Sequence, residues 1–432
     1  MRTIIAAALV TFFSLALAAE PVAITHVTVV NTATGALQRD VTVVIDGARI
    51  TRVGGDATPP AGSKVVDGRG KFLIPGLWDM HAHLSWTTSS ALPLLIANGV
   101  TGVRDLGGRL TELDNWRSRI DAGLLAGPRI IRVGPILNGK SFNRYQFVPG
   151  TPEQTRAVAR LLKFIGVDYL KVHRRMERDS YFALIDEAKA LGLQVVGHIP
   201  MAVSPAEASD AGQSTIEHVA TLFEGTFSTA VGDRPLVPAM QQWRATDAEP
   251  LFARFVKNGT AFDPTLFAYF PRDARTDSPY VARSFKLEAD KRPAATAAEL
   301  ASGRAIYEEY KEVVRAANRA GVTILAGSDI ADVRLPGFTV HEELAALVEC
   351  GLTPQQALQA ATQNASKVMN RANDFGTVEA GKVSDLVLLD ANPLDDIHNT
   401  TRITAVVANG KLFRRKELDA LLRLAQKLAA EN

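Results

Sequence analysis

The sequence predicts an α/β fold, a (β/α)8 TIM barrel with a small β-sandwich domain built from both chain ends. In residues 71–370, short apolar strands alternate with helical stretches of about ten to twenty residues, an alternation typical of parallel sheets. Eight strands can be counted there, and eight strand–helix units favour closure into a barrel. An open doubly wound sheet is the alternative on periodicity alone. Alternating runs of Val, Ile and Thr on both sides of this region predict the small β domain.

The eight expected strands are short apolar runs bounded by turn residues. They cover residues 72–83, 99–108, 128–137, 167–173, 193–200, 214–220, 259–266 and 322–330. Between them, residues 152–165, 178–191 and 299–320 have the apolar spacing of helices.

The small β domain is expected to combine residues 20–70 with residues 371–415. Both segments contain short alternating runs punctuated by Gly and Asp, which indicate hairpins. Residues 416–432 are amphipathic, so we expect a final helix packed on the outside of the protein.

Residues 1–19 have the features of a secretory signal peptide. Arg2 gives a positive start, an apolar stretch follows, and small residues close it at Ala16, Ala18 and Ala19. An uncleaved membrane anchor is the alternative, although a spanning helix usually needs ~20 apolar residues. We therefore expect an exported protein, periplasmic or secreted, that has no membrane contact after cleavage.

Charge and cysteine content exclude several classes of protein. The formal net charge is +2 over 432 residues, so no strongly basic face for nucleic acid is indicated. Cys350 is the only cysteine, which excludes a disulfide framework or a thiolate metal cluster within one chain. The sequence also lacks a Gly-x-Ser-x-Gly elbow, a phosphate-binding loop and a dinucleotide fingerprint. A homo-oligomer is compatible with this composition.

Polar residues gather at the carboxyl ends of the expected strands, where a parallel barrel carries its chemistry. The first strand ends with two histidines one residue apart, and strand alternation turns both rings to the same face. Taken singly, each polar residue has a structural explanation: a hydrogen-bonded core histidine, a helix-capping aspartate or a lysine at an exposed edge. Together they predict a metal-ligating cluster. Its members are His81, His83, Lys171, His198, His218 and Asp329.

The motifs that carry these residues resemble those of a known family. DMHAH, YLKVH, GHIP, IEHVA and LAGSD are similar to the strand-end motifs of the amidohydrolase superfamily, in its binuclear-metal branch. The resemblance runs from about residue 22 to about residue 413 and includes the return segment GTVEAGKVSDLVLLDANPL. Within the superfamily, the sequence resembles exported imidazolonepropionase-like and Xaa-Pro dipeptidase-like members, which hydrolyse dipeptides or N-acyl amino acids.

The resemblance implies two divalent metal ions. His81, His83 and Asp329 would hold the more buried ion, and His198 and His218 the more exposed one. Zinc suits mixed imidazole and oxygen ligands best, and manganese, cobalt or iron are alternatives.

The resemblance also implies that Lys171 bridges both ions as an N6-carboxylated lysine. An ammonium group would be repelled by two dications, whereas the neutral amine can add CO₂ and become an anion that the metals stabilise. Water between the ions would be activated as hydroxide to attack a carbonyl carbon, with Asp329 as the proton shuttle to the leaving nitrogen.

The expected function is hydrolysis of the C–N bond in small amides such as dipeptides or N-acyl amino acids. A binuclear esterase, lactonase or phosphotriesterase is one alternative, because the same hydroxide attacks those bonds. A cyclic-amide hydrolase of the imidazolone type is another, although such enzymes generally lack the carboxylated lysine. A metal-bearing protein without activity would require a gap in the ligand set, and the sequence has none.

Substrate contacts are harder to predict. Tyr145 and Arg144 lie in the loop after the third strand, where they are expected to bind a substrate oxygen or face solvent. His173 should point the same way as Lys171, toward the pocket or an outer layer. His341 is expected either to orient a metal ligand from behind or to lie on the surface.

Overall fold

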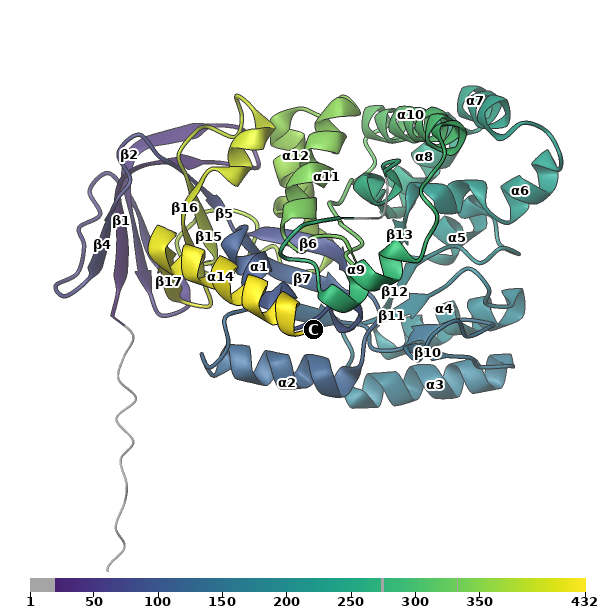
Figure 1. Cartoon of the computed structure of the whole chain (residues 1–432), viewed down its shortest axis with the longest axis horizontal. Helices are drawn as coiled ribbons and strands as arrows, with labels where there is room; N and C mark the ends of the chain where they lie inside the picture. The colour runs from purple at the N-terminus through teal and green to yellow at the C-terminus, as the bar shows by residue number, and fades with distance from the viewer. Residues whose placement is uncertain (1–19, 273–275, 332) are drawn as a thin grey trace, which may run out of the picture.

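A computed structural model describes residues 20–272, 276–331 and 333–432, and the expected signal peptide at residues 1–19 lies outside them. Figure 1 shows two parts side by side: a β-rich part built from both chain ends and a larger part of strands and surrounding helices.

The β-rich part is one hydrogen-bonded sheet of eight strands in the order β17-β16-β15-β5-β1-β2-β3, with β4 also paired to β1. Its strands are β1 (Val22–Val30), β2 (Leu37–Asp46), β3 (Arg49–Gly54), β4 (Lys64–Asp67), β5 (Phe72–Pro75), β15 (Leu386–Leu389), β16 (Ile403–Ala408) and β17 (Lys411–Arg414). The two chain ends join where β5 pairs antiparallel with β15. Inward-facing Val, Ile and Leu side chains form a separate core cluster there. The expected sandwich is therefore a single sheet folded around that core in the described part of the chain.

The expected first barrel strand, residues 72–83, is in fact two strands. β5 belongs to the small sheet, and β6 (Leu77–Ala82) begins the parallel strands after Gly76. Only glycine fits between them, because a Cβ at this position would lie 2.0 Å from the Oγ1 of Thr101. The chain therefore passes from the small sheet to the parallel strands at Gly76.

The parallel strands form two sheets, one in the order β6-β7-β8 and one in the order β10-β9-β11-β12-β13-β14. Their bounds are β7 (Val100–Asp105), β8 (Arg129–Arg132), β9 (Ile136–Leu137), β10 (Gln146–Phe147), β11 (Tyr169–Val172), β12 (Gln194–Gly197), β13 (Thr215–Glu217) and β14 (Ala261–Asp263). The backbone N–H of Asp168, just before β11, donates to the carbonyl of Arg132 at the end of β8, which joins the two sheets.

The expected eighth strand, residues 322–330, is not a regular strand in the described structure. It makes isolated parallel bridges, from Ile324 to Phe262 on one side and from Ile330 to Ala82 on the other. The ladder is interrupted because the N–H of Ser328 donates to the side chain of Asp79 and not to a backbone carbonyl. No continuous ring of strands is therefore formed among the described residues, although this segment bonds to both neighbouring strands.

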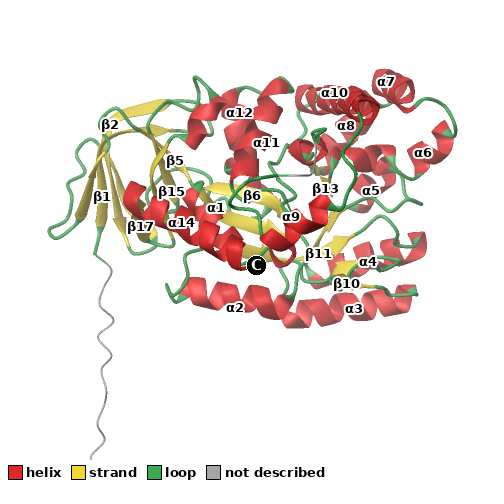
Figure 2. Cartoon of the chain, viewed as in Figure 1, coloured by secondary structure: helices red, strands yellow, loops and turns green. Residues whose placement is uncertain are grey.

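Helices cover the outside of the parallel strands (Figure 2). They are α1 (Ala91–Ala97), α2 (Leu110–Asp121), α3 (Pro152–Ile165), α4 (Arg178–Leu191), α5 (Pro205–Ala211), α6 (Thr226–Val231), α7 (Leu236–Thr246), α8 (Ala248–Asn258), α9 (Arg283–Asp290), α10 (Ala297–Arg319), α11 (Phe338–Glu349), α12 (Pro354–Ala360), α13 (Gln363–Val368) and α14 (Arg415–Glu431). Short 3-10 turns are η1 (Leu84–Trp86), η2 (Val219–Phe223), η3 (Leu266–Tyr269) and η4 (Ile397–Thr401).

The expected helices at 152–165 and 178–191 have these bounds in the structure. Thr151 caps the first of them, with Pro152 at its start and a left-handed Gly166 at its end, a standard pattern of helix signals. The final helix α14 packs against α1. None of the described helices is both long enough and apolar enough to cross a membrane.

Candidate metal centre

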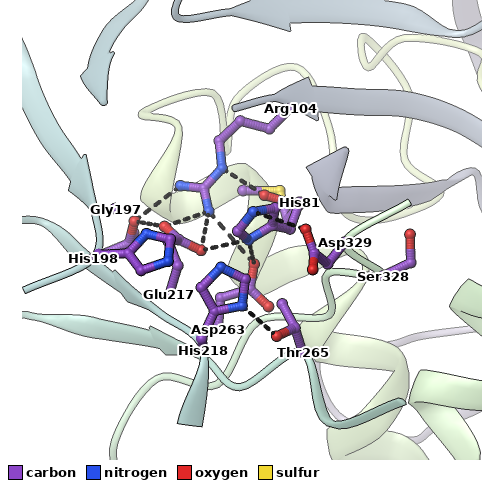
Figure 3. Close-up of polar contacts among 12 residues, drawn as sticks. His81, Arg104, Gly197, His198, Glu217, His218, Asp263, Thr265, Ser328 and Asp329 are labelled. Carbon is purple, nitrogen blue, oxygen red and sulfur yellow. Dashed lines mark hydrogen bonds and ion pairs between the residues drawn. The ribbon is translucent and has the colours of Figure 1, made fainter. Parts of the chain in front are cut away.

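Four histidines converge at the carboxyl ends of the parallel strands, and Figure 3 shows three of them, His81, His198 and His218. His81 lies near the end of β6, and His198 and His218 directly follow β12 and β13. The ring centroids of His81 and His218 are 4.5 Å apart, and those of His198 and His218 are also 4.5 Å apart. The ring of His83 lies 5.2 Å from that of His81. The four imidazoles therefore form one contiguous cluster.

The carboxylate of Asp329 closes this cluster on one side. Its Oδ1 lies 3.5 Å from the Nε2 of His81 and 3.5 Å from the Nε2 of His83. Ligand atoms of His81, His218 and Asp329 all lie within 4.8 Å of one another. Three donors this close can hold one divalent ion with little movement.

Lys171 is the buried amine of the site. It lies in β11, is 1% exposed, and its Nζ has no hydrogen-bond partner among the described residues. Burial lowers the pKa of Lys171 to about 8, so the neutral amine is accessible near physiological pH. Gly197 permits the close approach of the next strand, because a Cβ there would lie 2.8 Å from the Cδ of Lys171.

Three residues of the site have a left-handed backbone: His218 (φ 69°), Thr265 (φ 45°) and Asp329 (φ 50°). Such conformations cost non-glycine residues of order 1–3 kcal/mol and cluster at functional sites. Backbone bonds hold two of them, since the N–H of His218 donates to the carbonyl of Asp263 and that of Asp329 donates to the carbonyl of His81, each at 2.8 Å. These turns at the strand ends aim the side chains of His218 and Asp329 at the cluster.

The ionisation states suit metal binding. Burial lowers the pKa of His81 to about 4 and holds the pKa of His198 and of His218 well below their usual range. Burial alone would raise the pKa of Asp329, but the contact with His83 and nearby positive charge hold it well below its ordinary value. Neutral imidazole and ionised carboxylate are the forms that coordinate metals.

The residues present fit divalent metal ions. Both ring nitrogens of His81 and the Nδ1 of His198 are buried, and none of them finds a hydrogen-bond partner in the described part of the chain. Buried polar atoms are normally satisfied, so such atoms require an explanation. A set of imidazole nitrogens, a carboxylate and an amine that can be carboxylated supplies the nitrogen and oxygen ligands of zinc and similar ions.

A buried ion-pair network beneath the histidines was not expected from the sequence. The Nη2 of Arg104 donates to both carboxylate oxygens of Glu217, at 2.9 and 3.0 Å, and its Nε donates to the carbonyl of Met80. Asp263 lies 3.6 Å from the same Nη2, and Glu217 lies 3.5 Å from the Nδ1 of His81. The single guanidinium balances the charge of Glu217, and burial beside Glu217 raises the pKa of Asp263 well above its ordinary value. Ligand atoms of His81, Glu217 and Asp263 also lie within 4.8 Å of one another, so this group borders the metal centre from below.

The sequence contained signals for this network. Arg104 lies inside the second expected strand, residues 99–108, and in the structure it is in β7 and fully buried. A charged side chain in an apolar strand indicates an internal partner. Glu217 precedes His218 in the IEHVA motif, and strand alternation would place it on the same face as Thr215, to which it is bonded.

Two of the expected substrate contacts lie at the edge of the cluster. Tyr145 donates to the carbonyl of Ser85 at 2.8 Å, and its ring stacks on Trp86 with centroids 5.7 Å apart. Trp86 in turn stacks on His83 at 4.1 Å. Arg144 is exposed and donates to the hydroxyl of Tyr145. Tyr145 therefore touches the site through Trp86, and Arg144 lies one residue farther out.

His173 adjoins the cluster directly. Its ring centroid is 4.1 Å from that of His198 and 5.0 Å from that of the half-exposed Phe142. His341 points elsewhere, because its two ring nitrogens face the carbonyl of Asn98 and the hydroxyl of Thr400. His341 therefore neither lies on the surface nor supports a metal ligand.

The parallel strands, their surrounding helices and this ligand set define a metal-dependent hydrolase. The amidohydrolase family profile matches residues 72–413, so the chain belongs to the amidohydrolase family, whose members hydrolyse C–N bonds. The resemblance inferred from the motifs is thereby confirmed. The family has a TIM-barrel fold with an extra domain and generally depends on two metal ions.

Sequence relatives include imidazolonepropionases. That of Symbiobacterium thermophilum is 25% identical over 355 residues, which cover 76% of this chain and 77% of that protein. That of Shouchella clausii is 35% identical over 106 residues, but this match spans only 23% of each chain.

Solved structures agree on the fold. A Bifidobacterium longum protein with a proposed prolidase assignment is 27% identical, with a TM-score of 0.70 over 94% of this chain and 99% of its own. Bottromycin amidohydrolase gives a TM-score of 0.77 at 23% identity, covering 95% of this chain and 90% of its own, which shows likeness of fold alone.

Proposed function

We propose that this protein is an exported, metal-dependent amidohydrolase that cleaves the C–N bond of small peptide-like amides. One observation carries the proposal: ligand atoms of His81, His218 and Asp329 lie within 4.8 Å of one another at the carboxyl ends of parallel strands. In the proposed (β/α)8 barrel, residues 322–330 take the place of the eighth strand through their bonds to both neighbours.

Two ions would be held by the residues that the motifs indicate. His81, His83 and Asp329 would bind one, His198 and His218 the other, with Lys171 between them. The ions, most simply zinc, would supply Lewis acidity toward the amide carbonyl and a water activated at neutral pH.

Asp329 is the proton carrier in this proposal. Its Oδ1 faces the Nε2 atoms of His81 and His83, whereas its Oδ2 faces Arg334 at 3.8 Å. A carboxylate kept ionised in this way can take a proton from the attacking water at Oδ2. It then delivers that proton to the leaving nitrogen, which would otherwise depart as a poor amide anion.

Lys171 supports the binuclear form over a mononuclear one. The amine is buried and its lowered pKa favours the neutral form, which adds CO₂ at Nζ and releases a proton to give a carbamate anion. We expect Lys171→Ala to lose metal and activity, and short carboxylic acids to restore part of both. Full activity of that variant would contradict the bridging role.

The substrate pocket is proposed to bind an apolar or aromatic group beside the metal ions. Trp86 lies against His83, and Phe142 lies against both Trp86 and His173. Phe142 is 53% exposed, so an apolar ligand group that covered it would remove apolar surface from water. A dipeptide or N-acyl amino acid with an apolar side chain fits this wall.

A cyclic amide is the second candidate substrate, favoured by the relatives named imidazolonepropionase. The deciding experiment measures product release from dipeptides, N-acyl amino acids, aryl amides and imidazolonepropionate. The metal-loaded protein is compared with Asp329→Asn and with the control Asp385→Asn. Asp385 is a buried aspartate just before β15, and it pairs with Arg129 at the start of β8.

If Asp329→Asn releases no product and Asp385→Asn still does, the protein is supported as a C–N hydrolase. The compounds it prefers would then define its substrate class. No release from any of them, with about two metal ions per chain bound, would overturn the amidase proposal in favour of esters, lactones or phosphotriesters.

Export rests on the sequence of residues 1–19 alone. Protein purified from an exporting host is expected to begin at Ala19 or Glu20, and N-terminal sequencing measures this. An intact Met1 in the soluble fraction would contradict the proposed cleavage.

A further inference from the structure

A hydroxyl group behind the cluster contacts one of the proposed ligands. The Oγ1 of Thr265 and the Nδ1 of His218 are 2.8 Å apart and hydrogen-bonded, and both side chains are buried (Figure 3). Because this bond engages Nδ1, it leaves Nε2 as the nitrogen that can coordinate a metal ion. A hydrogen bond on the second ring nitrogen fixes both the tautomer and the orientation of a ligating histidine.

Thr265 is held in a conformation that a β-branched residue disfavours. Its φ is 45°, in the left-handed region, and it immediately precedes η3. The next two backbone amides, of Leu266 and Phe267, donate to the two carboxylate oxygens of Glu343 at 2.9 and 2.7 Å. Glu343 therefore caps the start of η3 from the neighbouring helix α11 and fixes the turn that contains Thr265.

Glu343 is an unusual residue for this position. It is fully buried, and burial raises its pKa to about 8. An apolar side chain would pack in such a place without that cost, so the two hydrogen bonds of the carboxyl group are what offset its burial. Within the described part of the chain, those bonds go to the turn that carries Thr265.

The main chain around His218 is tied to the same turn. The N–H of His218 donates to the carbonyl of Asp263, and the N–H of Val219 donates to the carbonyl of Pro264, at 2.8 and 3.0 Å. The ligand and the residue that orients it are therefore carried on two strand ends bonded to each other. A shift of the turn at Thr265 would be passed directly to the imidazole.

We propose that Thr265 and Glu343 are positioning residues for His218. Glu343 holds the amides of η3, this keeps Thr265 in its left-handed conformation, and the Thr265 hydroxyl orients the imidazole toward the metal. This inference rests on the proposed function, since it assumes that His218 is a metal ligand. Neither residue touches the reacting atoms, so both act through the ligand.

The test loads each protein with cobalt and records the visible absorption of the bound ion and the rate of its release to a chelator. Thr265→Val removes the hydroxyl at nearly constant volume, Thr265→Ser keeps it, and Glu343→Gln keeps the shape but not both acceptor oxygens. The matched control is Thr155→Val, which removes a buried threonine hydroxyl bonded to the carbonyl of Thr151 in α3, outside the site.

Release from Thr265→Val and Glu343→Gln should be about 10–100-fold faster than from the unaltered protein, with a changed cobalt spectrum. Thr265→Ser and Thr155→Val should release the ion at the unaltered rate. If Thr265→Val does not fold, Thr265→Ala is compared with Thr265→Ser in its place.

The outcomes separate the two proposals. If the unaltered protein binds no cobalt, the metal centre itself is wrong and this inference is overturned with it. If the unaltered protein binds cobalt, and Thr265→Val and Glu343→Gln release it at the same rate with the same spectrum, the metal centre stands and the positioning role is overturned. Lower thermal stability with unchanged release would likewise assign both residues a purely structural role.

Discussion

Replacing Arg104 tests whether the buried network holds the centre of the protein together. The Arg104 guanidinium is fully buried and pairs with Glu217 through contacts of 2.9 and 3.0 Å. At this distance and an effective dielectric constant of about 20, the two charges attract by about 5 kcal/mol. Desolvation offsets much of that gain, but Arg104→Met leaves Glu217 as an unpaired buried charge beside Asp263. We therefore expect the free energy of unfolding to fall by about 3–5 kcal/mol.

Urea unfolding of the metal-free protein, followed by tryptophan fluorescence, measures this loss. A matched control is Arg160→Met, which breaks a pair with Glu187 of similar length, 2.8 Å, but with the Arg160 side chain 60% exposed. Exposed pairs contribute little, so the control should lose less than about 1 kcal/mol. The double variant Arg104→Met with Glu217→Gln removes both charges and should lose clearly less than the sum of its single variants.

Two results would refute this reasoning. One is a loss for Arg104→Met no larger than that of the surface control. The other is a double variant whose loss equals the sum of the two single losses, because the charges would then be energetically independent.

Three further predictions concern the centre itself. Gly197→Ala should lose bound metal, since its Cβ would lie 2.3 Å from the carbonyl oxygen of Val172. The control Gly166→Ala should keep its metal, because no described atom lies within 4 Å of the added Cβ. Equal metal content of the two variants by elemental analysis would contradict the steric argument. Dialysis against a chelator should abolish amine release, and zinc or manganese should restore it; activity that survives complete removal would exclude a metal role. Burial lowers the pKa of His173 to about 3. In the metal-free protein, this histidine therefore gains a proton below about pH 6.5 when the protein is unfolded but stays neutral when it is folded. The free energy of unfolding consequently falls as the pH falls. The free energy of unfolding of His173→Asn, measured in urea relative to the unaltered protein, should therefore be about 2 kcal/mol more favourable at pH 5 than at pH 8. A difference between the two proteins that does not depend on pH would contradict the lowered pKa.

Strand positions could be predicted because their apolar runs end in polar residues that have no place in a core. The histidines, Lys171 and Asp329 were found in this way, and the structure brings them to one end of the parallel strands. The segment 322–330 was misassigned because its apolar pattern does not reveal that the side chain of Asp79 takes over a backbone hydrogen bond at Ser328.

The partners of the supporting residues could not be predicted, for a different reason. Arg104 and Glu217 are 113 positions apart in the chain, and Thr265 and Glu343 act through bonds to a histidine and to two amides. Periodicity describes neighbours along one element, whereas these partners are chosen by the way distant elements pack. His341 shows the same limit, since its partners Asn98 and Thr400 lie on segments remote from it in sequence.

The pairing of β5 with β15 has a consequence for how the protein is made. β5 leads through Gly76 directly into the strand that carries His81, yet its antiparallel partner is not synthesised until residues 386–389. The chain must therefore be almost finished before β5, which leads into β6, gains its antiparallel partner. Pairing on that side of β5 is therefore a late step, which requires the C-terminal segment to be present.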